Sequence, residues 1–238
     1  GSRSKKDVQQ LFSTTEELLE TPEALQDRFV DTEEYIKQHA NVFIIGAAVI
    51  LFAVGGYFGY QYYLSGQNQT AQEEMFQAIY YFESDSLNLA LNGDGNNYGF
   101  LEIMDEFGGT DAANLASYYA GIIELRQGNY ESAIDYLEGF SASDLLVQGQ
   151  AYVLIGDAYM ELGDHQAAAS QYEQAANYNP NQFFSPLYLM KAAVAYETAG
   201  NYAQATESYQ QIIDEYPEAY EYQEAQKQHA RLEALSAN

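Results

Sequence analysis

The chain has 238 residues, of which 35 are acidic and nine are basic, and its formal net charge is −26. Because contacts to phosphate groups need lysine and arginine, this charge argues against a protein that binds nucleic acid. The absence of cysteine excludes disulfide bonds and thiolate metal sites, and it leaves the cellular compartment open.

Residues 1–40 form the segment before a long apolar run. Ser13 with Glu16, and Thr21 before Pro22, have the spacing of helix start signals. The segment is too short to enclose a hydrophobic core of its own. We therefore expect either a mobile tail or a docking segment, and the tail is the preferred interpretation.

Residues 41–63 are predicted to form a transmembrane helix. Residues 42–60 carry no charge, and the run has the length of about 20 residues that a helix needs to cross the hydrocarbon core. The apolar region of a cleaved signal peptide would be shorter and nearer the start, so we expect a retained signal anchor. The tyrosines that would form an interfacial aromatic belt at its end are Tyr57, Tyr60, Tyr62 and Tyr63.

Basic residues are divided unevenly between the two sides of this run. Those before it are Arg3, Lys5, Lys6, Arg28 and Lys37. Those after it are Arg126, Lys191, Lys227 and Arg231. Because short segments rich in lysine and arginine stay on the cytoplasmic side, we expect a cytoplasmic N-terminus, with the C-terminal part on the opposite side of the membrane.

Small residues within the run suggest a surface for helix packing. Gly55 and Gly59 form a G-x-x-x-G pair, and Gly46 lies nearby. Glycines at this spacing let a second helix approach closely, although glycine is also common in membrane helices for other reasons. Both interpretations stay open for Gly46, Gly55 and Gly59.

A motif recurs in the C-terminal half of the sequence. Gly128-Asn129-Tyr130, Gly163-Asp164-His165 and Gly200-Asn201-Tyr202 follow one another at spacings of 35 and 37 residues. A small residue follows each motif at the same offset, at Ala133, Ala168 and Ala205. A large apolar residue comes four positions later, at Leu137, Tyr172 and Tyr209. Such a period indicates stacked helix-turn-helix units.

This pattern resembles the tetratricopeptide repeat (TPR), in which two amphipathic helices form each unit. The second unit matches best, at Tyr152, Ile155, Gly156, Tyr159, Gly163, Ala168, Tyr172, Ala175 and Pro180. In the first unit, Glu124 stands where an aromatic residue is usual. The predicted fold is therefore all-α, with one N-terminal transmembrane helix followed by a solenoid of helix-turn-helix repeats.

The repeats divide the rest of the chain. Residues 64–110 are predicted to be a degenerate lead-in repeat of two helices, with a turn at residues 92–97. Residues 111–217 are predicted to hold three TPR units. Residues 218–238 are predicted to form a capping helix, which packs through Tyr222, Leu232 and Leu235.

The order of these parts resembles the YfgM-like proteins of bacterial inner membranes. Short stretches at residues 55–60, 91–95, 107–110 and 118–121 are also similar to that family. The resemblance implies an ancillary subunit of the SecYEG translocon in the inner membrane, with its repeats in the periplasm. It further implies a PpiD-type chaperone as partner and secreted client chains as substrates of the pair.

The sequence contains no motif for catalysis or for a cofactor. The three histidines, His39, His165 and His229, do not have the spacing of metal ligands. Phosphate-binding loops and the nucleophile elbow are absent. A calcium loop counted from Asn92 would need glutamate at its twelfth position, where Ile103 stands. We therefore predict no enzyme activity, no cofactor and no metal.

The TPR resemblance implies that the first helix of each unit lines a groove for a partner. The predicted groove residues are Tyr118, Ile122, Leu125, Val153, Asp157, Met160, Met190, Val194 and Glu197. These positions contain no cation, which disfavours a clamp on a carboxylate, and methionine and tyrosine suit adaptable apolar recognition. The alternative is that some of these residues only pack between helices.

These observations predict a membrane-tethered interaction module at the secretion machinery. A scaffold for envelope assembly or cell division is the alternative from the same architecture. A hydrolase or transferase whose site the sequence does not reveal is the alternative from another class, and it would need a pocket with convergent titratable groups.

Overall fold

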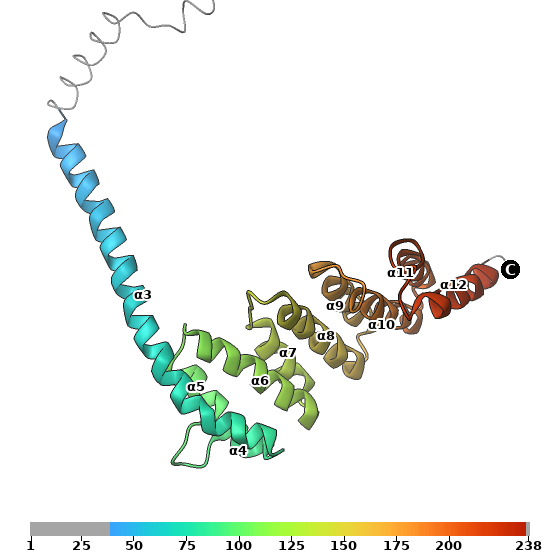
Figure 1. Ribbon diagram of the computed structural model, residues 1–238, viewed down its shortest axis with the longest axis horizontal. Coiled ribbons are helices and arrows are strands. Elements are labelled where there is room, and N and C mark those ends of the chain that lie inside the picture. Colours follow the sequence, from blue (N-terminus) through green and yellow to red (C-terminus); the bar gives the residue numbers. More distant parts are fainter. Residues whose placement is uncertain (1–38, 237–238) are drawn as a thin grey trace, which may run out of the picture. The chain divides into compact units, whose positions relative to one another are not determined.

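The computed structural model describes residues 39–236, and over this range all regular secondary structure is α-helical, which confirms the predicted fold class (Figure 1). The predicted cytoplasmic segment 1–40, including its helix start signals and its basic residues, lies outside the described residues except at its last two positions. The chain forms two units that divide between Tyr62 and Tyr63.

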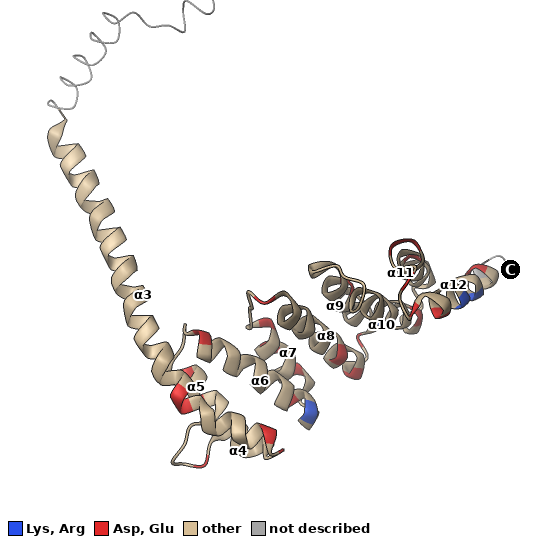
Figure 2. Cartoon of the chain, viewed as in Figure 1, with Lys and Arg blue, Asp and Glu red and all other residues tan. Residues whose placement is uncertain are grey.

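The first unit contains the apolar part of helix α3, whose bounds are Ala40–Glu83. Among the described helices, α3 alone is long and apolar enough to cross a membrane. Figure 2 shows no charged residue along its N-terminal part. Large apolar side chains are exposed along this helix, and Phe52 is 83% exposed. Such a surface needs an apolar surrounding.

The glycines proposed for helix packing lie on this exposed part of α3. A Cβ atom built on Gly46, Gly55 or Gly59 would meet no atom within 4 Å. The space beside them is therefore open, and their role in packing stays a prediction.

The second unit begins with a lead-in of three helices. The C-terminal part of α3 buries Ala71, Met75 and Ala78, which pack in one cluster with residues of α4 (Leu87–Asn92), α5 (Phe100–Glu106) and α6 (Asp111–Gln127). The sequence predicts two helices here, and the structure adds α4, a short helix that buries Ala90 and Leu91 in the same cluster.

The turn at residues 92–97 is organised by Asp94. Its Oδ1 accepts hydrogen bonds from the backbone N–H groups of Asn96 and Asn97, at 2.8 and 2.7 Å. Its Oδ2 accepts a hydrogen bond from the Tyr81 hydroxyl at 2.7 Å, which ties the turn to α3. These donors hold the pKa of Asp94 below its usual value, with the Tyr81 hydroxyl as the largest cause.

Three helical hairpins follow the lead-in. The first pairs α6 (Asp111–Gln127) with α7 (Tyr130–Glu138), and the second pairs α8 (Leu145–Leu162) with α9 (His165–Tyr178). The third pairs α10 (Ser185–Thr198) with α11 (Tyr202–Glu215). The glycine of each recurring motif makes the turn inside its hairpin. Gly128, Gly163 and Gly200 have φ angles of 82°, 81° and 80°, in the left-handed region that favours glycine.

Helix α12 (Tyr222–Ser236) packs on α11 and ends the array. Ala225 and Leu232 are buried in the cluster that also contains Tyr209 and Ile212 of α11. The sequence prediction was correct for Leu232 and wrong for Leu235, which is 62% exposed. Ala225 and Leu232 lie two helical turns apart and share a face, whereas Leu235 lies beyond the buried part of that face.

Candidate functional site

The first helices of the hairpins, α6, α8 and α10, carry the nine predicted groove residues, and we call the surface that these residues define the first-helix face. Tyr118 lies at its α6 end, with its ring 4.9 Å from that of Phe140. Burial raises the pKa of Tyr118, and the nearby hydroxyls of Tyr119 and Tyr188 raise it further.

A hollow of about 320 Å³ opens between α6, α7 and α8. The side chains that line it are Leu125, Tyr130, Asp157, Met160 and Glu161. Three of them, Leu125, Asp157 and Met160, are predicted groove residues that the fold brings together. Tyr130 and Glu161 are not among the predicted groove residues, although Tyr130 stands in the recurring turn motif.

Asp157 of α8 is the centre of a polar contact between the second and third hairpins. Its Oδ1 accepts a hydrogen bond from the Tyr172 hydroxyl at 2.6 Å, within the second hairpin. The same oxygen accepts one from Lys191 Nζ of α10 at 2.7 Å, and this ammonium lies 5.1 Å from the centroid of the Tyr172 ring. The ion pair therefore joins neighbouring repeats across the first-helix face.

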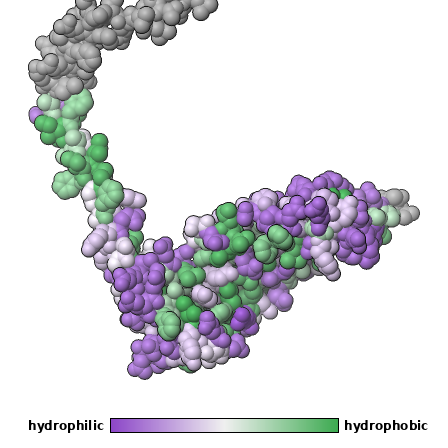
Figure 3. Space-filling model, in the orientation of Figure 1, coloured by the Kyte–Doolittle hydropathy of each residue, from purple (hydrophilic) through white to green (hydrophobic). Residues whose placement is uncertain are grey.

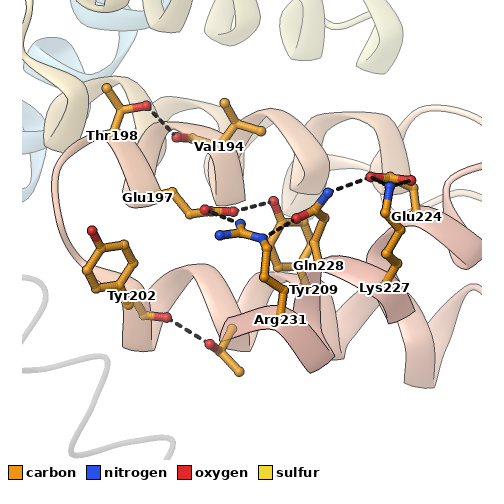
Figure 4. A network of polar contacts seen from close by, with 10 residues as sticks. Val194, Glu197, Thr198, Tyr202, Tyr209, Glu224, Lys227, Gln228 and Arg231 are labelled. Atoms are coloured by element: carbon orange, nitrogen blue, oxygen red, sulfur yellow. Dashed lines mark hydrogen bonds and ion pairs between the residues drawn. The ribbon is translucent and has the colours of Figure 1, made fainter. Parts of the chain in front are cut away.

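A related arrangement joins the third hairpin to α12 (Figure 4). Glu197 of α10 accepts a hydrogen bond from the Tyr209 hydroxyl at 2.8 Å and is ion-paired with Arg231 of α12. Arg231 Nε also donates to Gln228 Oε1 at 2.6 Å. Figure 4 shows the guanidinium between these two partners. The carboxylate of one repeat thus contacts a tyrosine of its own hairpin and a cation of the next helix.

Two cations, Lys191 and Arg231, contact predicted groove residues, which the sequence did not indicate. The nine predicted positions contain no cation, but Lys191 directly follows Met190, and Arg231 reaches Glu197 from the capping helix. Neither contact was predicted, because repeat spacing does not show which neighbouring side chain reaches a carboxylate. Each cation is paired within the protein, so a partner meets balanced charge at the α10 end.

The two tyrosines in these contacts remain protonated far into the alkaline range. Burial raises the pKa of Tyr172, and its hydrogen bond to Asp157 raises it further. The pKa of Tyr209 is raised by burial first and then by its hydrogen bond to Glu197. Both hydroxyls act as permanent donors near neutral pH.

The structure differs from the prediction at Val153, which is 4% exposed and lies in the hydrophobic cluster that includes Leu189 and Ala192 of α10. The side chain is buried between neighbouring helices, so it is not available to a partner. Met190 is partly buried in the same cluster, whereas Val194 is 48% exposed.

The α6 end of the first-helix face is apolar. Ile122 and Leu137 of the first hairpin stand where the second hairpin has Asp157 and Tyr172. On the side shown in Figure 3, hydrophobic surface gathers over the α6 and α8 part of the array, and hydrophilic surface dominates near α12. The face is therefore apolar towards the first hairpin and ion-paired towards the last.

Within residues 39–236, no group of three or more histidine, aspartate or glutamate side chains is placed to hold a metal ion. The buried tyrosines act as donors to carboxylates. The face offers apolar contact and fixed charge, which are the elements of protein recognition.

Stacked helical hairpins with a terminal helix packed on the last one define a helical-repeat protein of the solenoid class. A family model described as tetratricopeptide repeat matches residues 118–185 and 153–220, so this part of the chain consists of tetratricopeptide repeats, which form a protein–protein interaction module. No curated protein matches the chain.

Proposed function

We propose that the protein is a membrane-anchored interaction module that binds a segment of another protein on its first-helix face, without catalysis. The observation that carries this proposal is the hollow between α6, α7 and α8, because it joins predicted groove residues from neighbouring hairpins into one recess. Around it, Tyr118, Ile122, Met190, Val194 and Glu197 extend the surface that a partner would contact.

We further propose where this module acts. The apolar run of α3 anchors it in a bacterial inner membrane, with residues 1–40 in the cytoplasm and the repeats, residues 111–217, in the periplasm. Its partners are the SecYEG translocon and a PpiD-type chaperone, and the assembly acts on secreted client chains. This placement is supported by the distribution of basic residues and by the resemblance to YfgM-like proteins. Gly46, Gly55 and Gly59 would provide a second contact, within the membrane.

Co-purification of the full chain in mild detergent tests this proposal. We expect translocon and chaperone components to be recovered with the unchanged protein. The double variant Ile122→Glu with Val194→Glu places charges on the partly buried Ile122 and the 48% exposed Val194 of the first-helix face, and it should reduce recovery of the chaperone. Leu235→Glu is the matched control, because it adds a carboxylate to an exposed leucine of the capping helix.

Circular dichroism of each variant confirms that the helices are retained. If the unchanged protein recovers neither a translocon component nor a chaperone, the proposed placement is wrong. Recovery of envelope-assembly or division proteins instead would favour a scaffold of that kind.

A further inference from the structure

We infer that the hollow lined by Leu125, Tyr130, Asp157, Met160 and Glu161 receives an apolar side chain of a partner segment that also carries a lysine or arginine beside it. The inference rests on the proposed function and specifies the chemistry of the partner. The basic residue would lie against the carboxylates of Asp157 and Glu161.

The volume and the walls of the hollow favour a side chain as its occupant. About 320 Å³ is at the lower end of the range for small-molecule sites, which hold whole ligands in roughly 300–1,000 Å³. Leu125 and Met160 form apolar walls, and each is only partly buried by the protein. Methionine adapts to apolar groups of different shape, which suits an aliphatic or aromatic side chain.

Carboxylate oxygens at the hollow remain open to a cation. Both donors to Asp157, the Tyr172 hydroxyl and Lys191 Nζ, use Oδ1, and no hydrogen bond from the described residues reaches Oδ2. Glu161 is exposed, and in the part of the chain that the structure describes its carboxylate accepts one side-chain hydrogen bond, from the Tyr130 hydroxyl at 3.4 Å. Each carboxylate can therefore accept a further donor.

The charge around the hollow is negative overall. Asp157 and Glu161 line it, and Lys191 is the cation that pairs with one of them. Arg126 directly follows Leu125, but its guanidinium lies over the ring of Phe82 and 3.8 Å from Asp85. This cation is therefore paired with residues of the lead-in. The net charge of −26 adds a long-range field that attracts cationic segments and repels acidic ones.

An acidic segment fits the same hollow poorly. It would have to draw Lys191 away from Asp157 and from the face of the Tyr172 ring. That step would leave a half-buried carboxylate without its cation, beside the new negative charge. Charge complementarity thus selects the basic partner.

Fluorescence anisotropy with labelled synthetic peptides tests the inference on the full chain in detergent micelles. Three peptides of equal length share one leucine-containing segment and differ at one flanking position, which is lysine, glutamine or glutamate. We expect the lysine peptide to bind about tenfold more tightly than the glutamate peptide, with glutamine between them. The difference should shrink as salt is raised.

Glu161→Gln should reduce the preference for lysine and leave the affinity of the glutamine peptide nearly unchanged. Glu218→Gln is the matched control, because it removes the same charge from an exposed residue beyond α11. Equal affinity for the three peptides, tighter binding of the glutamate peptide, or no binding of any peptide would overturn the inference. Co-purification of the translocon or the chaperone would still support the proposed function in each of those cases, so the two failures are distinguishable.

Discussion

Gly156 of α8 lies directly against the ring of Tyr172 of α9, and a Cβ atom at this glycine would be 2.6 Å from Tyr172 Cε1. The first hairpin repeats the relationship, since a Cβ at Gly121 would be 2.5 Å from Leu137 Cγ. Because Gly156 has no side chain, the two helices of the second hairpin can approach each other closely at this position. The same contact positions the Tyr172 hydroxyl towards Asp157.

Gly156→Ala should destabilise the protein by about 1–3 kcal/mol, because the added methyl group forces a buried tyrosine ring to move. Chemical unfolding followed by circular dichroism measures the change. Gly149→Ala is the control on the same helix. Its new Cβ would meet no atom closer than 3.9 Å, so the gain in helix propensity, about 1 kcal/mol, should leave stability unchanged or raised. Equal losses at both glycines would contradict this account of the close approach.

Truncation of a buried and of an exposed leucine in α12 should change the free energy of unfolding by different amounts. Leu232 is 2% exposed, so Leu232→Ala should lower the free energy of unfolding by about 2–5 kcal/mol. Leu235→Ala changes a side chain that is 62% exposed and should have an effect of about 0.5 kcal/mol or less. Hydrogen exchange of the α11 and α12 amides would show whether the first variant releases the end of the array. A large loss in the second variant would mean that Leu235 packs on the array after all.

The buried tyrosines predict a loss of stability at alkaline pH. Burial and the hydrogen bond to Glu173 raise the pKa of Tyr196 to about 12, and the pKa values of Tyr172 and Tyr209 are also raised. Tyrosines in the unfolded chain lose their protons near about pH 10. Above this pH the folded state holds more protons, so its free energy of unfolding falls as pH rises. The stabilisation is fully present below about pH 10 and is lost towards the folded pKa values.

Each such tyrosine should contribute a slope of about 1.4 kcal/mol per pH unit between about pH 10 and pH 12. Urea unfolding at several pH values in this range measures the slope. Tyr172→Phe should reduce the slope by the contribution of about one proton. Tyr220→Phe should leave the slope unchanged, because Tyr220 is 97% exposed. An identical slope in the Tyr172→Phe variant would show that this hydroxyl titrates normally in the folded protein.

The apolar part of α3 predicts how the protein partitions. The full chain should sediment with membranes and require detergent for extraction, because large apolar side chains are exposed along this helix. A fragment that starts at Tyr63 contains the second unit, and it should be soluble without detergent. Replacing Ile45 and Val49 with arginine should weaken membrane association of the full chain. Membrane sedimentation of the fragment would indicate a second attachment site in the repeats.

Much of the fold follows from local signals in the sequence. The glycines of the recurring motif mark turns because few other residues adopt their left-handed conformation, and the spacing of Ala133, Ala168 and Ala205 marks the buried side of each second helix. The short helix α4 was missed because its six residues lie between turn signals, and the contacts that bury Ala90 and Leu91 are with residues distant in the sequence.

The candidate site was predictable only in part. Helical periodicity identifies which residues face the same way, so Leu125, Asp157 and Met160 could be assigned to one surface from the sequence. Periodicity does not show how deeply a neighbouring helix covers a position. For that reason the burial of Val153 was not predicted, since this residue has the spacing of a groove residue. Periodicity also does not show which side chains meet, and the contacts of Lys191 and Arg231 were missed for that reason.

The sequence by itself indicated a helix long and apolar enough to cross a membrane and a helical repeat, because these depend on spacing and composition within one or two helices. Only the tertiary structure decided which carboxylates are paired and which stay open at the hollow. Those contacts join residues such as Asp157 and Lys191, which are 34 positions apart and belong to different repeats. Their distance is set by how neighbouring hairpins stack, and no local pattern records it.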